Sequence, residues 1–290
     1  MKNNKAVLTA ILSLGIMSNT YGGMLETEML NSYIENTNYQ VPTAQNLQVA
    51  QALFESVLKD KIVKSQDVMA WTNLGFTLKQ ITEGAYNYAV IGETNPAQGK
   101  GQGFYVIKLN GAASQNILEA PHRPSDLYTH QIIFKLLVEG NYLAAAWNTT
   151  NRSNVDFGKH TSSYYNAFTI AAANVLSAPK LIQLHAFDAS SIEVEGDLIL
   201  SSTTKTPSPE YGQIANCLKT QMVAPVPLVI LQYPQDVQDL GGTLNINAKK
   251  FYETNANGKF YHVETSKLLR QLLRDVSSMR NSFSKCFIGS

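Results

Sequence analysis

The stretch Asn116-Ile-Leu-Glu-Ala-Pro-His122-Arg-Pro-Ser-Asp126 carries an apolar run directly into a loop that holds an imidazole and a carboxylate. Two later segments have the same form, since Leu181-Ile-Gln-Leu ends at His185 and Phe260-Tyr-His-Val leads to Glu264. If the three runs are strands of one sheet, these side chains lie at strand ends, where open α/β sheets place their sites. The three segments therefore predict both a class of fold and the position of a site.

Strands and helices are expected to alternate along the chain after residue 116. The expected strands cover 117–120, 142–147, 181–184, 198–201, 227–232 and 259–263, and the expected helices cover 127–139, 164–176, 209–222 and 266 to about 283. The alternation predicts an α/β fold with a mixed or mostly parallel central sheet and helices on both faces. Gly140 is expected to end the first of these helices in a left-handed conformation.

The preceding part of the chain predicts a helical addition to this fold. Thr43 is suited to cap a helix that runs through Val57, and a second helix is expected over 67–81. Strands over 86–92 and 103–109 follow, and we interpret the glycine-rich segment between them as a hairpin connection. With no internal repeat or low-complexity linker, the sequence predicts one domain over 23–290, with a helical elaboration over about 43–82.

The first 22 residues have the pattern of an export signal. Lys2 and Lys5 precede an apolar stretch from Ala6 to Met17, which is too short to span a bilayer. Thr20 and Gly22 then supply small residues at positions −3 and −1 of one possible cleavage site. We predict that residues 1–22 are a signal peptide and that the mature protein is periplasmic or secreted. The alternatives are an uncleaved anchor and a buried core helix.

The charge and the hydropathy of the chain limit the classes of partner, and its two cysteines allow two covalent states. The formal net charge is +1, and no basic stripe interleaved with aromatic residues is present, which argues against a nucleic-acid partner. No apolar run after residue 22 approaches about 18 residues, so no membrane span is expected in the mature chain. Cys217 and Cys286 form one disulfide or remain two buried thiols.

The four strand-end side chains have the composition of a catalytic zinc site. Such a centre has two imidazoles and a carboxylate as ligands and leaves its fourth position open. We therefore predict that His122, Asp126 and His185 bind a zinc ion. Glu264 is expected to be the general base that takes a proton from the nucleophilic water. Arg152, which follows the strand ending at residue 148, is expected to polarise a carbonyl or to pair with a substrate carboxylate.

Each assignment has a structural alternative. His122 also fits a satisfied loop histidine, and Asp126 also fits a cap for the helix that follows it. Arg152 also fits a solvated loop arginine. His185 is the strongest of the candidates, because an imidazole that ends an apolar strand needs a reason to be half buried. His262 is expected to face away from Glu264 across the strand, and it is left outside the site.

Four segments resemble a known family when they are read in order. They are Pro121 through Thr129, Asn148 through Arg152, Gln183 through Phe187, and His262 through Arg270. Together they resemble the zinc-dependent hydrolases related to zinc carboxypeptidases, in the branch that contains poly-γ-glutamate hydrolases and N-formylglutamate amidohydrolases. The resemblance covers roughly residues 100–275, which it identifies as the metal-site core.

This resemblance implies a phosphorylase/hydrolase-like three-layer fold with a mixed central sheet and one zinc ion. It carries over His122, Asp126 and His185 as ligands, Glu264 as the catalytic glutamate, and Arg152 as a looser match to an oxyanion or carboxylate-binding arginine. The chain departs from the family in its first ligand loop. Its carboxylate follows the histidine by four residues where zinc carboxypeptidases have three, and Arg-Pro-Ser occupies positions where γ-glutamate hydrolases have glycines.

The sequence thus predicts an exported zinc-dependent hydrolase of an amide bond in a peptide or an N-acylated amino acid. Metal-bound water would be the nucleophile and Glu264 the general base. Two alternatives stay open: an exported binding protein that keeps the hydrolase fold without turnover, and a zinc esterase or deacetylase. The partner is a small-molecule or peptide substrate in either catalytic interpretation.

Overall fold

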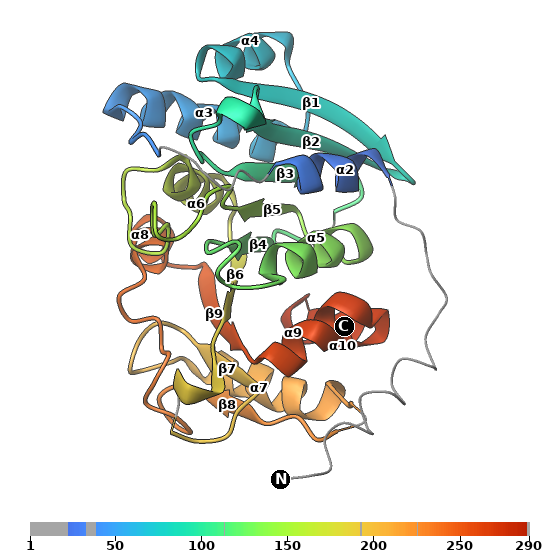
Figure 1. Ribbon diagram of the computed structural model, residues 1–290, viewed down its shortest axis with the longest axis vertical. Coiled ribbons are helices and arrows are strands. Elements are labelled where there is room, and N and C mark those ends of the chain that lie inside the picture. The colour runs from blue at the N-terminus through green and yellow to red at the C-terminus, as the bar shows by residue number, and fades with distance from the viewer. Residues whose placement is uncertain (1–22, 33–38, 113, 192, 225, 289–290) are drawn as a thin grey trace.

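A mixed sheet forms the centre of the molecule in the computed structural model, which describes residues 23–32, 39–112, 114–191, 193–224 and 226–288 (Figure 1). The predicted signal peptide lies outside these described residues. Within them the sheet has nine strands, in the order β1-β2-β3-β5-β4-β6-β9-β7-β8. The strands are β1 (Phe76–Glu83), β2 (Tyr86–Glu93), β3 (Phe104–Lys108), β4 (Ile117–Ala120), β5 (Ala144–Trp147), β6 (Lys180–Ala186), β7 (Leu198–Ser201), β8 (Ile230–Gln232) and β9 (Lys259–Thr265).

Four neighbouring strands in the middle of the sheet run parallel. They are β5, β4, β6 and β9, and antiparallel strands β3 and β7 flank them on either side. The carboxyl ends of the four parallel strands therefore lie along one edge of the sheet. In open α/β sheets the loops beyond this edge form the binding crevice, because strands that run the same way all deliver their following loops there.

Helices cover both faces of the sheet. They are α2 (Met24–Asn31), α3 (Ala44–Asp60), α4 (Ser65–Asn73), α5 (Thr129–Glu139), α6 (Tyr164–Val175), α7 (Pro209–Gln221), α8 (Ile246–Thr254), α9 (Lys267–Asp275) and α10 (Ser277–Ile288). In Figure 1, α6 and α8 lie on one side of the sheet, and α5, α9 and α10 lie on the other. The expected α/β architecture with a mixed sheet between two helical layers is confirmed.

The two layers enclose separate apolar cores, which the alternation of side chains along each strand supplies. Leu118 and Ile182 pack in the core under α2, α5, α7, α9 and α10. Their neighbours Ile117 and Leu181 pack in the core under α3, α4, α6 and α8. We refer to these as the α5 face and the α6 face of the sheet.

Three local expectations were wrong. The predicted helix over 67–81 ends at Asn73, and Phe76–Glu83 is the edge strand β1, because Gly75 turns the chain with a φ of +88° and β1 then pairs antiparallel with β2. The final helix is divided into α9 and α10 by Val276, which has an extended backbone. Gly140 ends α5 with a φ of −106°, so its conformation is not left-handed.

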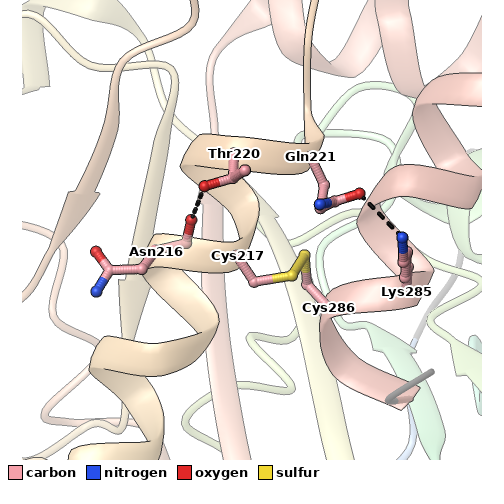
Figure 2. Close-up of a disulfide and its surroundings, with 6 residues drawn as sticks. All are labelled: Asn216, Cys217, Thr220, Gln221, Lys285 and Cys286. Carbon is pink, nitrogen blue, oxygen red and sulfur yellow. Dashed lines mark hydrogen bonds between the residues drawn. A yellow bond between two sulfur atoms is a disulfide. The ribbon is translucent and has the colours of Figure 1, made fainter.

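A disulfide joins Cys217 of α7 to Cys286 of α10, with the two Cα atoms 5.6 Å apart (Figure 2). Beside it the Lys285 ammonium donates a hydrogen bond to the Gln221 side-chain oxygen. The cysteines are 69 residues apart in sequence. In the loop-closure account, a cross-link over such a separation stabilises the fold by about 4 kcal/mol, because it restricts the unfolded chain. The disulfide therefore fastens the last helix to the body of the domain.

The longest of the described helices, α3, has 17 residues and an amphipathic sequence. Within the described ranges, no helix has the length and apolar character that crossing a bilayer requires.

Candidate metal centre

Strands β6 and β9 bring three polar side chains to the α6 face of the sheet at its carboxyl edge. His185 of β6 and Glu264 of β9 are partners in the register of these two parallel strands. His262 precedes Glu264 by two residues, and residues two apart on a strand point to the same face. The expectation that His262 faces away from Glu264 was therefore wrong. Its Nε2 lies 3.2 Å from Glu264 Oε1, and both side chains are buried.

The loop after β4 brings His122 and Asp126 to the same edge. It is a tight turn, in which the Asp126 N–H donates to the His122 carbonyl at 2.8 Å and the Arg123–Pro124 peptide bond is cis. The Asn148 side chain holds the turn, since it accepts from the Arg123 N–H and donates to the Arg123 carbonyl. These hydrogen bonds hold the backbone that carries both candidate ligands.

Three atoms of the predicted ligands converge on one point. His122 Nδ1 lies 3.2 Å from Asp126 Oδ2 and 3.1 Å from His185 Nδ1. Asp126 Oδ2 and His185 Nδ1 are 3.4 Å apart. A tetrahedral zinc ion with bonds of about 2.0–2.1 Å separates its ligand atoms by roughly 3.3 Å. The three predicted ligands are therefore brought together at the spacing that a tetrahedral centre requires, and all three are buried.

The opposite nitrogens of the two rings show which tautomer each histidine adopts. His122 Nε2 lies 2.9 Å from Asp156 Oδ1, and His185 Nε2 lies 2.8 Å from Gln183 Oε1. Both partners are acceptors, so both Nε2 atoms carry a hydrogen, and the Nδ1 atoms are the nitrogens that can bind a metal once they are deprotonated. Metal-bound histidines in proteins make this kind of outer hydrogen bond, which fixes the ring orientation.

The Gln183 amide is itself fixed by two neighbours. Its Nε2 donates to Glu119 Oε2 at 2.8 Å, and its Oε1 accepts a hydrogen bond from the Asn245 amide. Glu119 lies on the neighbouring strand β4 in register with Gln183, and burial raises the pKa of this carboxyl to about 7. A chain of buried hydrogen bonds thus runs from Glu119 through Gln183 to His185.

The donor set fits a cation. Two imidazole nitrogens and a carboxylate oxygen meet within 3.4 Å of one another, where their lone pairs repel unless a proton or a metal ion lies between them. Burial lowers the pKa of His185 to about 4, so this ring is neutral at pH 7. Burial acts to raise the pKa of Asp126, but its hydrogen bonds with both rings outweigh burial and hold the pKa below its usual range. A neutral ring and an ionised carboxylate are the forms that bind metal.

His122 differs from His185 in its protonation. Burial acts to lower its pKa, but hydrogen bonds with Asp126 and Asp156 outweigh burial and raise the pKa. A proton therefore competes with a metal ion for this ring. Metal binding displaces that proton, as ligand deprotonation generally requires.

The alternative role of Asp126 as a helix cap is excluded. Helix α5 begins at Thr129 with Tyr128 as its N-cap, and no side chain caps it. The Asp126 carboxylate is instead directed at the two histidines, and its Oδ2 also accepts from the Ala186 N–H at 3.2 Å. Its side chain therefore belongs to the site and not to the helix end.

Arg152 lies at the edge of the site and forms an ion pair with Asp156. Its Nε and Nη2 donate to Asp156 Oδ2 at 3.2 and 3.1 Å, and 42% of its side chain is exposed. Asp156 thus links Arg152 to His122. No periodic signal in the sequence points to Asp156, because it lies in an irregular loop 34 residues after His122.

A second group of possible ligands shares His185. It consists of His185, His262 and Glu264, whose candidate atoms lie within 4.8 Å of one another. Within it, His262 Nε2 lies 3.2 Å from Glu264 Oε1. Among the described residues, His262 Nδ1 and Glu264 Oε2 have no hydrogen-bond partner. The first group is the predicted ligand set, whose three pairwise distances lie between 3.1 and 3.4 Å, and the Glu264 carboxylate lies in the same cleft.

A cleft of about 190 Å³ opens onto these side chains. The candidate ligands, Asp156, His262 and Glu264 lie in its lining, together with Arg152 and Lys159. The segment that contains Leu240, Gly242 and Leu244 completes its wall. The cleft gives a small molecule or a chain end access to the candidate metal centre.

Asp156 provides a test of this outer partner. We expect Asp156→Asn to weaken zinc binding by about 10- to 100-fold, because the asparagine lacks the charge that supports His122 and pairs with Arg152. Competition with a chromogenic chelator measures the affinity. Asp60→Asn, on the exposed end of α3, is the matched control and should bind zinc normally. Equal affinity of both variants and the unaltered chain would remove Asp156 from the site.

A scan against protein-family models and a search of curated proteins find no match. Among solved structures, a bacteriophage poly-gamma-glutamate hydrolase is similar at 9% identity, over 64% of this chain and 86% of that one, with a TM-score of 0.39. The succinylglutamate desuccinylase of Chromobacterium violaceum is 10% identical over 77% of this chain and 73% of that one, with a TM-score of 0.41. A metallo-carboxypeptidase from Burkholderia cenocepacia is 7% identical over 78% of this chain and 68% of that one, with a TM-score of 0.40.

Proposed function

We propose that this protein is an exported zinc-dependent hydrolase of an amide bond in a peptide or an N-acylated amino acid. The observation that carries the proposal is the convergence of His122 Nδ1, His185 Nδ1 and Asp126 Oδ2 at the spacing of a tetrahedral site. Three protein ligands leave one position open, which is the arrangement of catalytic rather than structural zinc centres.

The chemistry divides between the ion and the side chains around it. His122, Asp126 and His185 would hold a zinc ion, which when bound would supply polarisation of a carbonyl oxygen and a lowered pKa for a water molecule. Glu264 lines the same cleft, with one carboxylate oxygen held by His262 and the other without a partner among the described residues. This second oxygen is suited to accept the proton of the attacking water and to return it to the leaving amine.

His262 serves this reaction as a positioning residue. Its hydrogen bond to Glu264 Oε1 fixes the carboxylate in one orientation, and its ring packs against that of His185 with centroids 4.2 Å apart. Glu264 is thereby held beside the metal ligands without being one of them.

The cationic edge of the cleft suits an anionic substrate. Lys159 is exposed there, and Arg152, which donates to Asp156, keeps 42% of its side chain exposed, so that it can also contact a substrate carboxylate or a carbonyl oxygen. A chain end or an amino-acid carboxylate next to the scissile amide meets both requirements. The proposed substrates therefore carry a free carboxylate.

The disulfide supports the proposed export. Disulfides form and persist in oxidising compartments, such as the periplasm or the extracellular space. The bond between Cys217 and Cys286 would be reduced in an ordinary cytosol. Together with the signal-like pattern of residues 1–22, it favours a periplasmic or secreted protein.

Removal of the metal tests the proposed function. We expect the purified mature protein to hydrolyse short peptides or N-acyl amino acids, to lose this activity on treatment with a chelator, and to regain it when zinc is restored. Amine release from each substrate, compared with its matched ester, measures the bond preference. Cleavage of esters or acetyl groups alone would indicate the esterase or deacetylase, and zinc binding without turnover on the whole panel would indicate a binding protein.

A further inference from the structure

Helix α2 begins at a glycine that lies directly against a carboxylate. Gly23 is the N-cap of α2, and a Cβ atom at this position would lie 2.4 Å from the carboxyl carbon of Glu83. Both Glu83 oxygens would lie within 2.5 Å of that Cβ. Any side chain at position 23 would therefore displace Glu83. The absence of one is what lets the carboxylate reach the backbone here.

The Glu83 carboxylate is bound at this point but not neutralised. Its Oε2 accepts a hydrogen bond from the Leu25 N–H at 3.0 Å, and Glu83 is only partly exposed. No lysine, arginine or histidine among the described residues forms an ion pair with it. A negative charge near the start of a helix is favourable. A positive charge next to the Glu83 carboxylate would stabilise that carboxylate further.

The predicted export signal would create such a charge at this position. Cleavage after Gly22 leaves Gly23 as the first residue, with a free α-ammonium group. Standard backbone geometry places a nitrogen about 2.5 Å from its own Cβ, so the Gly23 nitrogen lies within about 5 Å of both Glu83 oxygens. Rotation of the Glu83 side chain closes that distance to an ion pair.

The opposite end of α2 contacts the metal-site loop. Arg123, which follows the ligand His122, donates from Nη1 to the Met29 carbonyl at 3.4 Å and to the Ser32 hydroxyl at 3.2 Å. The Trp147 indole N–H donates to the same hydroxyl at 3.3 Å. Helix α2 therefore spans from Glu83 on the sheet edge to the loop that carries His122.

We propose that removal of the signal after Gly22 exposes an α-ammonium group that pairs with Glu83 and docks helix α2 against the sheet. Removal of the signal thereby completes the folded domain and stabilises the hydrogen bonds between the end of α2 and Arg123. The inference rests on the proposed export and is independent of hydrolysis, because every measurement below is made on chain mass or stability.

The test first determines the N-terminus and then measures the coupling of Glu83 to it. Intact mass of the exported protein should show a chain that begins at Gly23. A second chain keeps Tyr21 and Gly22 ahead of Gly23, and each chain is also made with Glu83→Gln. We expect the two extra residues to lower the Tm by about 2–4 °C, because they remove the charge from Gly23. In the Glu83→Gln background the extension should have no effect.

Glu28→Gln is the matched control, because Glu28 of α2 pairs with Lys79 of β1 at 2.8 Å without involving the N-terminus. It should change the Tm equally in the extended and unextended chains. An extension effect of the same size with and without the Glu83→Gln substitution would overturn the proposal, because Glu83 would then act only as a cap of the helix. A mature chain that starts elsewhere would also overturn it. Neither result depends on whether the protein hydrolyses amides.

Discussion

Glu264→Gln should reduce kcat by about 10²- to 10⁴-fold while the protein keeps one zinc ion per chain. The glutamine side chain has nearly the same shape, so the cleft and the three ligands stay in place. Its amide cannot accept a proton from water or return one to the leaving amine. Steady-state kinetics on the best amide substrate, together with zinc content by elemental analysis, measures the two quantities separately.

Glu253→Gln is the control for this substitution. Glu253 lies on α8 and forms an exposed pair with Lys250, away from the cleft lining. Its replacement should leave kcat and zinc content unchanged. Unaltered turnover of Glu264→Gln would exclude Glu264 as the base. Loss of zinc from that variant would place Glu264 among the ligands.

His185→Ala should abolish both zinc retention and activity. His185 supplies one of three converging ligand atoms, so its loss should weaken binding by more than the 10- to 100-fold expected for an outer partner such as Asp156. The remaining pair, His122 and Asp126, cannot hold the ion through purification. Zinc content after dialysis and affinity by chelator competition measure the effect.

His160→Ala is the control, because His160 lies outside the cleft and packs against Tyr39. It should retain zinc. Since His185 is buried, the fold of His185→Ala is checked by its circular dichroism and its Tm in the metal-free state. A folded His185→Ala protein that keeps a full equivalent of zinc would refute the assignment of this ligand.

The central part of the fold and the convergence of the candidate ligands were predictable because both depend on local patterns. Short apolar runs ended at His122, His185 and Glu264, and parallel strands necessarily deliver such end residues to one edge. The alternation of strands and helices between these runs then required a covered sheet. The structure confirms the architecture and brings the three predicted ligands together.

The edge of the sheet was harder to predict. The segment 67–81 combines a real helix, α4, with the first part of β1, and its apolar residues fit both periods over so short a range. Only pairing with β2 decides the conformation of β1, and that pairing is a tertiary contact. The position of Gly75 was the one local sign of a boundary.

The outer partners of the site divide into two kinds. His262 was predicted wrongly to face away from Glu264, although the two-residue period of a strand places the two side chains on the same face. Asp156 and Gln183 were not predicted as partners, because their roles follow from hydrogen bonds to ring nitrogens that only the folded chain defines. The candidate ligands thus follow from the ends of strands, whereas the hydrogen-bond partners that orient them follow from the packing of the folded chain.

The most direct test of the account is the position of zinc in crystals of the zinc-loaded protein, located by anomalous scattering at the zinc absorption edge. We predict one peak that lies about 2.0–2.2 Å from His122 Nδ1, His185 Nδ1 and Asp126 Oδ2. A peak bound by His262 and Glu264 instead, or no ordered zinc between the two Nδ1 atoms in a protein that carries a full equivalent, would contradict it.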